Sequence, residues 1–121
     1  MKKKRTLVLG ATTKENRYAN IAVKRLLSAG HEVVAIGNRS GSIAGVPIET
    51  TTLDFEDIDT VTLYLNPSRQ AAYYDYIISL RPQRVIFNPG TENLEFTERL
   101  AAHHIESQLA CTLVLLATNQ Y

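Results

Sequence analysis

Short runs of apolar and β-branched residues alternate along this chain with segments whose apolar residues recur at helical spacing. Such alternation is typical of α/β proteins, in which helices connect parallel strands. It constrains the fold strongly, because parallel strands need a helical layer on both faces of their sheet. We therefore predict a Rossmann-like, doubly wound α/β fold with a five-stranded parallel sheet, formed by residues 1–121 as one domain.

The predicted elements follow one another with short connections. We expect strands at residues 6–9, 32–36, 60–65, 84–87 and 105–109, and helices at 18–29, 68–80 (capped by Ser68), 94–104 and from Thr112 onward. The Gly/Ser/Thr-rich segment 37–52 is expected to be a connection that holds a small hairpin. Right-handed crossovers favour the strand order 3-2-1-4-5, with a crevice at the carboxyl ends of the first and fourth strands.

Composition excludes several classes of protein. Apolar residues make up 45% of the 121 positions, which suffices for one core, and no apolar run approaches the roughly 20 residues that cross a bilayer. The apolar stretch behind the basic residues 2–5 is too short for a signal peptide, so we expect a cytoplasmic protein. The single cysteine, Cys111, excludes an internal disulfide and a Cys-based zinc cluster.

Charge is unevenly distributed along the chain. Residues 1–40 hold nine Lys and Arg against two Glu, whereas the remaining residues hold four Lys and Arg against ten acidic residues. The basic part contains the loop that follows the first predicted strand, and this asymmetry is consistent with an anionic ligand. Within it, the loop positions of Lys14, Arg17 and Arg39 favour contact with that ligand.

Four polar loops are predicted to border the carboxyl edge of the sheet, at residues 10–17, 37–40, 66–68 and 88–92. Loops rich in Gly, Pro, Asn and Ser/Thr let backbone N–H groups approach a ligand, and the helix N-termini behind them favour phosphates. The alternative, that they are only tight turns, explains each loop separately. It explains less well why all four fall on one edge.

The first of these loops, "GATTKENRYAN", lacks the glycines of a dinucleotide site. The G-x-G-x-x-G fingerprint would need glycine at three positions, which Gly10, Thr12 and Glu15 occupy here. After the second predicted strand, Arg39 stands in a segment without the carboxylate that binds the ribose of NAD. NAD is therefore disfavoured, and an arginine suits a phosphate on the adenosine ribose, as in NADP or coenzyme A (CoA).

The chain also resembles a known family, the small single-domain CoA-binding proteins, whose fold is that of the CoA-binding domain of succinyl-CoA synthetase α subunits. The stretches that carry the resemblance are "TLVLGATTKENRYANIAVKRLLSAGHEVVAIG", "DTVTLYLNPSRQ", "RVIFNPGTEN" and "ACTLVLLATNQY", which together span almost the whole chain. The resemblance implies that CoA, or an acyl-CoA, binds in the predicted crevice.

The resemblance also implies which residues would hold the cofactor. Those implied for the pyrophosphate and adenosine portions are Gly10, Ala11, Thr12, Thr13, Asn16 and Arg17; for the adenine and ribose 3′-phosphate, Gly37, Asn38 and Arg39; and for the pantetheine side, Asn66, Pro67, Asn88, Pro89, Gly90 and Thr91. Relatives can carry further basic residues after the position of Arg39. Here Ser40 and Gly41 follow it, which implies a weaker grip on the 3′-phosphate.

Nothing in the sequence forms a recognisable catalytic or metal-binding set. His31, His103 and His104 are expected at the amino ends of strands, opposite the ligand edge. Cys111 is expected near the pantetheine side, where a mixed disulfide with the CoA thiol is the alternative to an ordinary buried cysteine. We find no arrangement of nucleophile, base and orienting group, and we therefore predict binding without evident catalysis.

Two other functions stay open at this point. A minimal NADP-binding reductase is disfavoured by the missing glycines and by the absence of a Tyr-x-x-x-Lys pair. A regulatory subunit that acts with a partner enzyme is the second alternative. We expect a small-molecule nucleotide ligand rather than nucleic acid or a membrane, and either a homodimer or a partner enzyme is compatible with the sequence.

Overall fold

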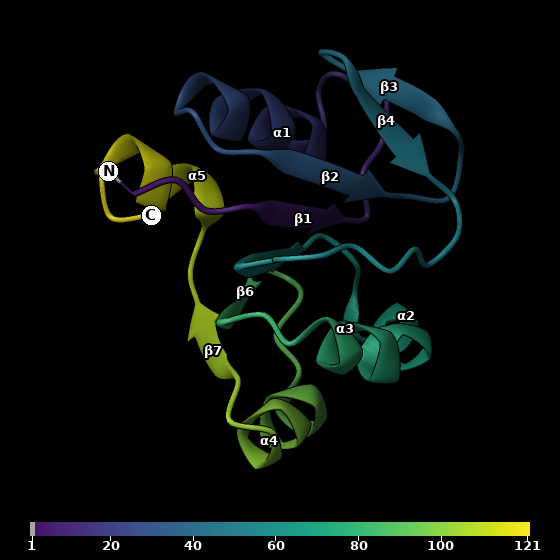
Figure 1. Ribbon diagram of the computed structural model, residues 1–121, viewed down its shortest axis with the longest axis vertical. Coiled ribbons are helices and arrows are strands. Elements are labelled where there is room, and N and C mark those ends of the chain that lie inside the picture. The colour runs from purple at the N-terminus through teal and green to yellow at the C-terminus, as the bar shows by residue number, and fades with distance from the viewer. Residues whose placement is uncertain (1) are drawn as a thin grey trace.

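A seven-stranded sheet runs through the computed structural model, which describes residues 2–121 (Figure 1). Its strands are β1 (Thr6–Leu9), β2 (Val33–Ile36), β3 (Gly41–Ile43), β4 (Val46–Glu49), β5 (Thr60–Leu63), β6 (Arg84–Phe87) and β7 (Glu106–Leu109). The helices are α1 (Tyr18–Ser28), α2 (Pro67–Gln70), the 3₁₀ turn η1 (Ala71–Tyr73), α3 (Tyr74–Leu80), α4 (Leu94–Ala102) and α5 (Thr112–Ala117). The predicted α/β fold is confirmed.

The sheet contains two strands more than predicted. All five predicted strands are present, and the segment expected to hold a small hairpin forms β3 and β4, which pair in antiparallel fashion. The hairpin joins the sheet because β4 also pairs in parallel with β2. Six strands are thus mutually parallel, and β3 alone runs the other way.

The predicted strand order is wrong in one respect. The observed order is β3-β4-β2-β1-β5-β6-β7, so β5 lies beside β1 and not beyond β2. The reason is that β4 occupies the free edge of β2, and residues 50–59 carry the chain back across the sheet to the other side of β1. The crevice of this doubly wound sheet therefore opens between the carboxyl ends of β1 and β5, and not between those of the first and fourth predicted strands, β1 and β6.

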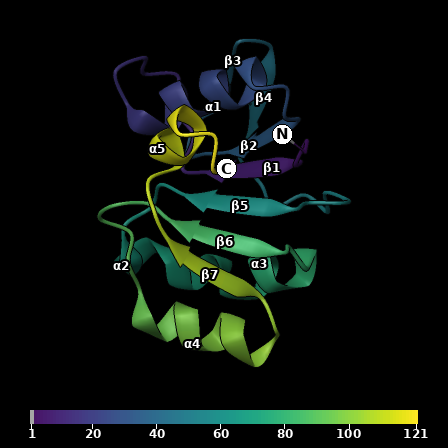
Figure 2. The ribbon, with the colours of Figure 1, turned by 90° about the vertical axis from the view of Figure 1, so that its left-hand side faces the viewer.

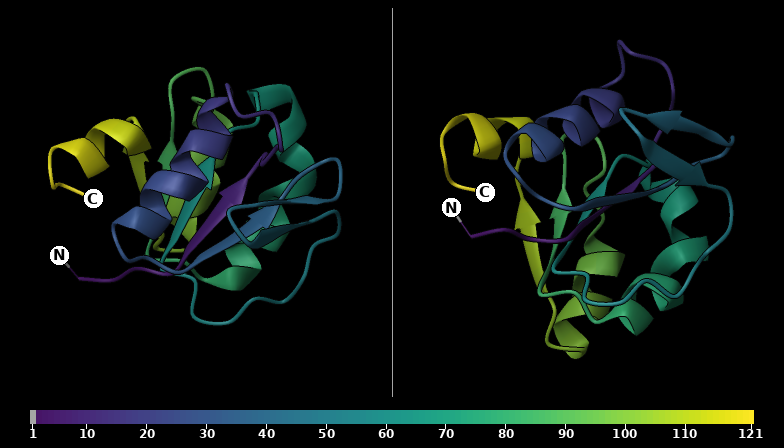
Figure 3. Two further views of the ribbon diagram at one scale, coloured as in Figure 1. Left: turned by 90° about the horizontal axis from the view of Figure 1, so that it is seen from above. Right: turned by 45° about the horizontal axis from the view of Figure 1, so that its top comes forward.

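Alternate residues of the central strands supply two separate cores. In β1, Leu7 and Leu9 pack with residues of α3 and α4, whereas Val8 packs with residues of α1 and α5. Figures 2 and 3 show these two helical layers on opposite faces of the sheet. The burial of β1, β5 and β6 on both faces explains why their sequences consist mainly of apolar and β-branched residues.

The helices begin at caps that differ in part from the prediction. Pro67 starts α2 after Asn66, so Ser68 is not the cap, and the segment 68–80 is divided by η1 into two helices. Asn93 caps α4 by accepting a hydrogen bond from the Phe96 N–H. The longest helix, α1, has 11 residues, and no helix within residues 2–121 is long and apolar enough to cross a membrane.

Candidate functional site

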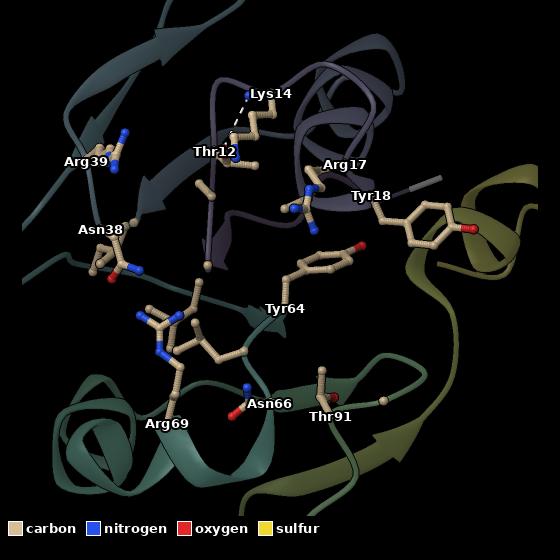
Figure 4. A pocket seen from close by; sticks show the side chains of 18 of the residues that line it. Thr12, Lys14, Arg17, Tyr18, Asn38, Arg39, Tyr64, Asn66, Arg69 and Thr91 are labelled. Atoms are coloured by element: carbon tan, nitrogen blue, oxygen red, sulfur yellow. Dashed lines mark hydrogen bonds between the residues drawn. The ribbon is translucent and has the colours of Figure 1, made fainter.

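A cleft of about 670 Å³ opens at the carboxyl edge of the sheet, between the ends of β1 and β5 (Figure 4). Its walls are the loops after β1, β2, β5 and β6 together with the first residues of α1, Arg69 of α2 and Tyr73 of η1. The volume lies in the range of about 300 to 1,000 Å³ that small-molecule sites occupy. The predicted convergence of four loops at one edge is therefore confirmed as geometry.

Two glycines allow these loops to approach one another. A Cβ atom on Gly37 would lie 2.2 Å from the Ala11 carbonyl oxygen, so no other residue fits there without a shift of backbone. Gly10 has a φ of +99°, and a Cβ on it would lie 2.9 Å from the carbonyl group of Tyr64. The ends of β1, β2 and β5 are thus packed backbone to backbone at the floor of the cleft.

The loop after β1 is held in place from the helix that follows it. The buried Asn20 side chain donates a hydrogen bond to the Thr12 carbonyl oxygen (2.9 Å), and the Lys14 N–H donates to the Thr12 hydroxyl (3.2 Å). The first residues of α1, Tyr18 and Ala19, line the cleft, and the first turn of this helix contains no acidic side chain. Its N–H groups therefore favour an anion in the cleft.

The cleft is strongly cationic. Four basic side chains line it, Lys14, Arg17, Arg39 and Arg69, and no Asp or Glu of residues 2–121 does so. Among the described residues, neither of the two ion pairs involves any of these four. Figure 4 shows Arg39, Lys14 and Arg17 on one side of the cleft and Arg69 reaching up from α2 on the other. An anion that enters the cleft is therefore approached by cations from both sides.

One end of the cleft is aromatic. The ring of Tyr64 lies below Arg17, and Tyr18 projects from the rim with 71% of its surface exposed (Figure 4). Burial raises the pKa of Tyr64 to about 12, so its phenol stays neutral at physiological pH. This end therefore offers flat apolar surface beside the cationic part of the cleft.

The structure brings twelve of the fifteen residues named from the sequence into the lining of the cleft. They are Gly10, Ala11, Thr12, Thr13, Arg17, Gly37, Asn38, Arg39, Asn66, Pro89, Gly90 and Thr91. Lys14, which the sequence favoured on charge, lines it as well. Asn16, Pro67 and Asn88 do not line the cleft, because a place in the correct loop does not set the direction of a side chain.

Asn88 is turned inward. Its Nδ2 donates to the Thr62 hydroxyl (2.7 Å) and the Leu63 carbonyl oxygen (2.9 Å), and its Oδ1 accepts from the Thr112 N–H (2.8 Å). The side chain thus ties the ends of β5 and β6 to the start of α5. Asn16 and Pro67 are exposed, with Pro67 in the first turn of α2.

Sequence reasoning missed several residues of the lining. The polar or aromatic ones are Tyr18, Tyr64, Arg69 and Tyr73. Of these four residues, Arg69 could have been predicted most readily, because it lies in the first turn of a helix that follows a parallel strand. The tyrosines gave no such signal, because an aromatic residue after a strand or in a helix is more often part of the core.

The histidines and the cysteine lie outside the cleft. His31 is buried at the amino edge, where its Nδ1 accepts from the Lys4 N–H (2.9 Å), and His103 and His104 follow the end of α4. Cys111 is half-buried at the cap of α5 and does not line the cleft. No group of three His, Cys, Asp or Glu in residues 2–121 is placed to hold a metal ion.

A Rossmann-like α/β domain with a cationic cleft at its carboxyl edge is the class of protein that this fold and site define. The model of the CoA binding domain family matches residues 4–117. The chain therefore belongs to the CoA-binding domain family, as the resemblance in the sequence indicated.

Solved structures agree with this assignment. A crystal structure of an uncharacterized protein is 48% identical and superimposes with a TM-score of 0.98, with 100% of each chain covered. A hypothetical protein from Pyrococcus horikoshii OT3 is 26% identical over 93% of this chain and 81% of that one, with a TM-score of 0.84.

A more distant similarity places the same fold inside a larger protein. A dinucleotide-forming acetyl-coenzyme A synthetase from Ca. Korarchaeum cryptofilum is 13% identical, with a TM-score of 0.72, and 86% of this chain matches 25% of that one. At this identity the likeness concerns the fold alone. A search of curated proteins found no match.

Proposed function

We propose that this protein binds CoA or an acyl-CoA in the cleft between β1 and β5. The observation that carries the proposal is the set of four cations, Lys14, Arg17, Arg39 and Arg69, in a cleft that no carboxylate of residues 2–121 lines. CoA carries a pyrophosphate and a ribose 3′-phosphate, and a phosphomonoester alone bears about 1.5 to 2 negative charges near neutral pH. Membership of the CoA-binding domain family supports the same ligand.

The two ends of the cleft suit the two halves of such a ligand. In this proposal the pyrophosphate lies over the loop from Gly10 to Thr13 and the N-terminus of α1, near Arg17. Arg39 meets the 3′-phosphate, because it stands after β2 where a dinucleotide site for NAD would have a carboxylate. The pantetheine then runs along Asn66 and the segment 89–91.

We propose binding without a covalent step. Among the described residues, the lining contains no His, Cys, Asp or Glu, which are the side chains that most often act as bases or strong nucleophiles. The role that this composition supports is to hold the ligand or present it to another protein.

A panel of ligands tests the proposal. Thermal unfolding is followed with CoA, acetyl-CoA, dephospho-CoA, NADP and NAD. A ligand present at about a hundred times its Kd stabilises the folded state by about 2.7 kcal/mol. We expect this effect with CoA and acetyl-CoA, and a smaller effect with dephospho-CoA at the same concentration, because its Kd should be higher. A clear effect with NADP and none with CoA would replace the proposal by the NADP-binding alternative.

A further inference from the structure

Gln70, the last residue of α2, is a polar side chain enclosed in the protein behind the cleft. It is 0% exposed and belongs to the largest fully buried side chains of the molecule. A buried amide is unfavourable unless its donors and acceptor find partners. The complete burial of Gln70 therefore calls for a specific set of polar contacts.

Those contacts join two of the four loops that form the walls of the cleft. The Gln70 Nε2 donates to the Leu65 carbonyl oxygen (2.9 Å), which belongs to the wall after β5. The same Nε2 donates to the Thr91 carbonyl oxygen (2.8 Å), which belongs to the wall after β6. Both donor hydrogens are thus used, and one side chain connects segments that are distant in the sequence.

The acceptor of Gln70 anchors this connection to the helices beneath. Its Oε1 accepts from the Asn93 Nδ2 (3.0 Å), which also donates to the Tyr74 hydroxyl (2.8 Å). The Asn93 Oδ1 caps α4. The segment between Asn88 and Asn93 is therefore held at both ends, and residues 89–91 between them line the cleft.

We propose that Gln70 is a positioning residue that sets the separation of these two walls, and through it the affinity for the part of the ligand that lies between them. Gln70 itself does not line the cleft. In the proposed function, on which this inference rests, the part concerned is the pantetheine. The adenosine phosphates lie beyond it, against the loops after β1 and β2.

The test compares CoA with adenosine 3′,5′-bisphosphate, which lacks the phosphopantetheine half of CoA, by calorimetric titration of the wild type and of Gln70→Met. Methionine fills a similar volume and leaves both carbonyl oxygens without a donor. We expect the variant to lose about ten-fold or more in affinity for CoA and less than about two-fold for the bisphosphate. The control is Ile77→Val, a mild change to the buried core of α3, which should alter neither affinity.

A second variant adds a readout that general destabilisation would not produce. In Gln70→Glu, burial beside two carbonyl oxygens raises the pKa of the introduced carboxyl, and its protonated form can donate to one of them. The ratio of CoA to bisphosphate affinity in this variant, divided by the wild-type ratio at the same pH, should therefore fall at neutral pH and recover as the pH is lowered. The division removes the titration of the bisphosphate 5′-phosphate, which is a monoester only in that ligand. A divided ratio that does not depend on pH overturns the inference.

The remaining outcomes are also decisive. Equal losses for both ligands in Gln70→Met, or no loss for either, overturn the inference and leave the proposed function intact. A wild type that binds neither ligand overturns the proposed function, and the inference with it. Should both variants fail to fold, NMR of the wild type decides. The Gln70 carboxamide protons should exchange slowly with solvent, and their exchange should become slower still when CoA is bound but not when the bisphosphate is bound. Fast exchange would overturn the inference.

Discussion

The ring of Tyr121 packs against the imidazole of His31, with the ring centroids 4.9 Å apart at the amino edge of the sheet. The Arg84 guanidinium lies 4.4 Å from the centre of the Tyr121 ring, and the Tyr121 hydroxyl is 2.5 Å from the hydroxyl of Thr6. Tyr121 thereby connects the segment after α5 to β1 and β6, on the side of the sheet away from the cleft.

Tyr121→Ala should destabilise the protein by about 3 kcal/mol, because it removes a buried aromatic ring and its contacts with His31 and Arg84. Tyr121→Phe keeps the ring and loses the hydroxyl, so about 1 kcal/mol is expected. Urea denaturation measures both. CoA affinity should be unchanged in the two folded variants, and a large loss of affinity would contradict the separation of the two edges.

His31 should make stability depend on pH. Burial, with the nearby charges of Lys4 and Arg84, lowers the pKa of His31 from its ordinary value of 6.5. Below that value His31 binds a proton in the unfolded chain but not yet in the folded protein. The stability that neutral His31 contributes is therefore fully present above about pH 6.5 and is lost as the pH falls toward the folded-state pKa.

Denaturation at pH values between 5 and 8 tests this expectation by giving the free energy of unfolding as a function of pH. The slope of that curve should be smaller in His31→Phe than in the wild type, by up to about one proton. Val114→Ala, which changes an exposed side chain that does not titrate, is the control and should leave the slope as it is. An unchanged slope in His31→Phe would show that another group is responsible.

Arg39→Ala should weaken CoA binding about ten-fold and dephospho-CoA binding much less, since a charge-assisted hydrogen bond to the 3′-phosphate is lost. Calorimetric titration gives both affinities. Lys24→Ala removes an exposed cation of α1 that does not line the cleft, and it controls for net charge. The same loss for the two ligands would count against the phosphate role of Arg39.

Gly37→Ala should be far more destabilising than Gly45→Ala. A Cβ on Gly37 meets the Ala11 carbonyl oxygen at 2.2 Å, whereas Gly45, at a φ of +87°, has open space around the added atom. We expect about 1 to 2 kcal/mol at Gly45 from the left-handed backbone alone, and a larger loss at Gly37. Urea denaturation of the two variants is sufficient, and equal losses would show that the loops can separate without penalty.

Much of the fold and of the site could be predicted from the sequence. Four of the five predicted strands, β1, β2, β5 and β6, followed from their runs of apolar and β-branched residues, and Arg39 followed from its place after β2. The position of β5 in the sheet could not be predicted, because it depends on whether the hairpin β3–β4 occupies the edge of β2. Asn88 shows the same limit for side chains, since its loop was predicted correctly but its amide turns inward to β5 and α5.

The sequence by itself determined the periodicity of the elements, the polar loops that follow the strands, and the cations in those loops, because these depend only on neighbouring residues. Tertiary structure decided which strands are adjacent, that Arg69 and Tyr64 join the same cleft, and that Gln70 connects its walls. The physical reason is that contacts between distant segments depend on how the layers pack. The directions of the side chains and the distances between loops on different strands are fixed only when the cores on the two faces of the sheet are packed.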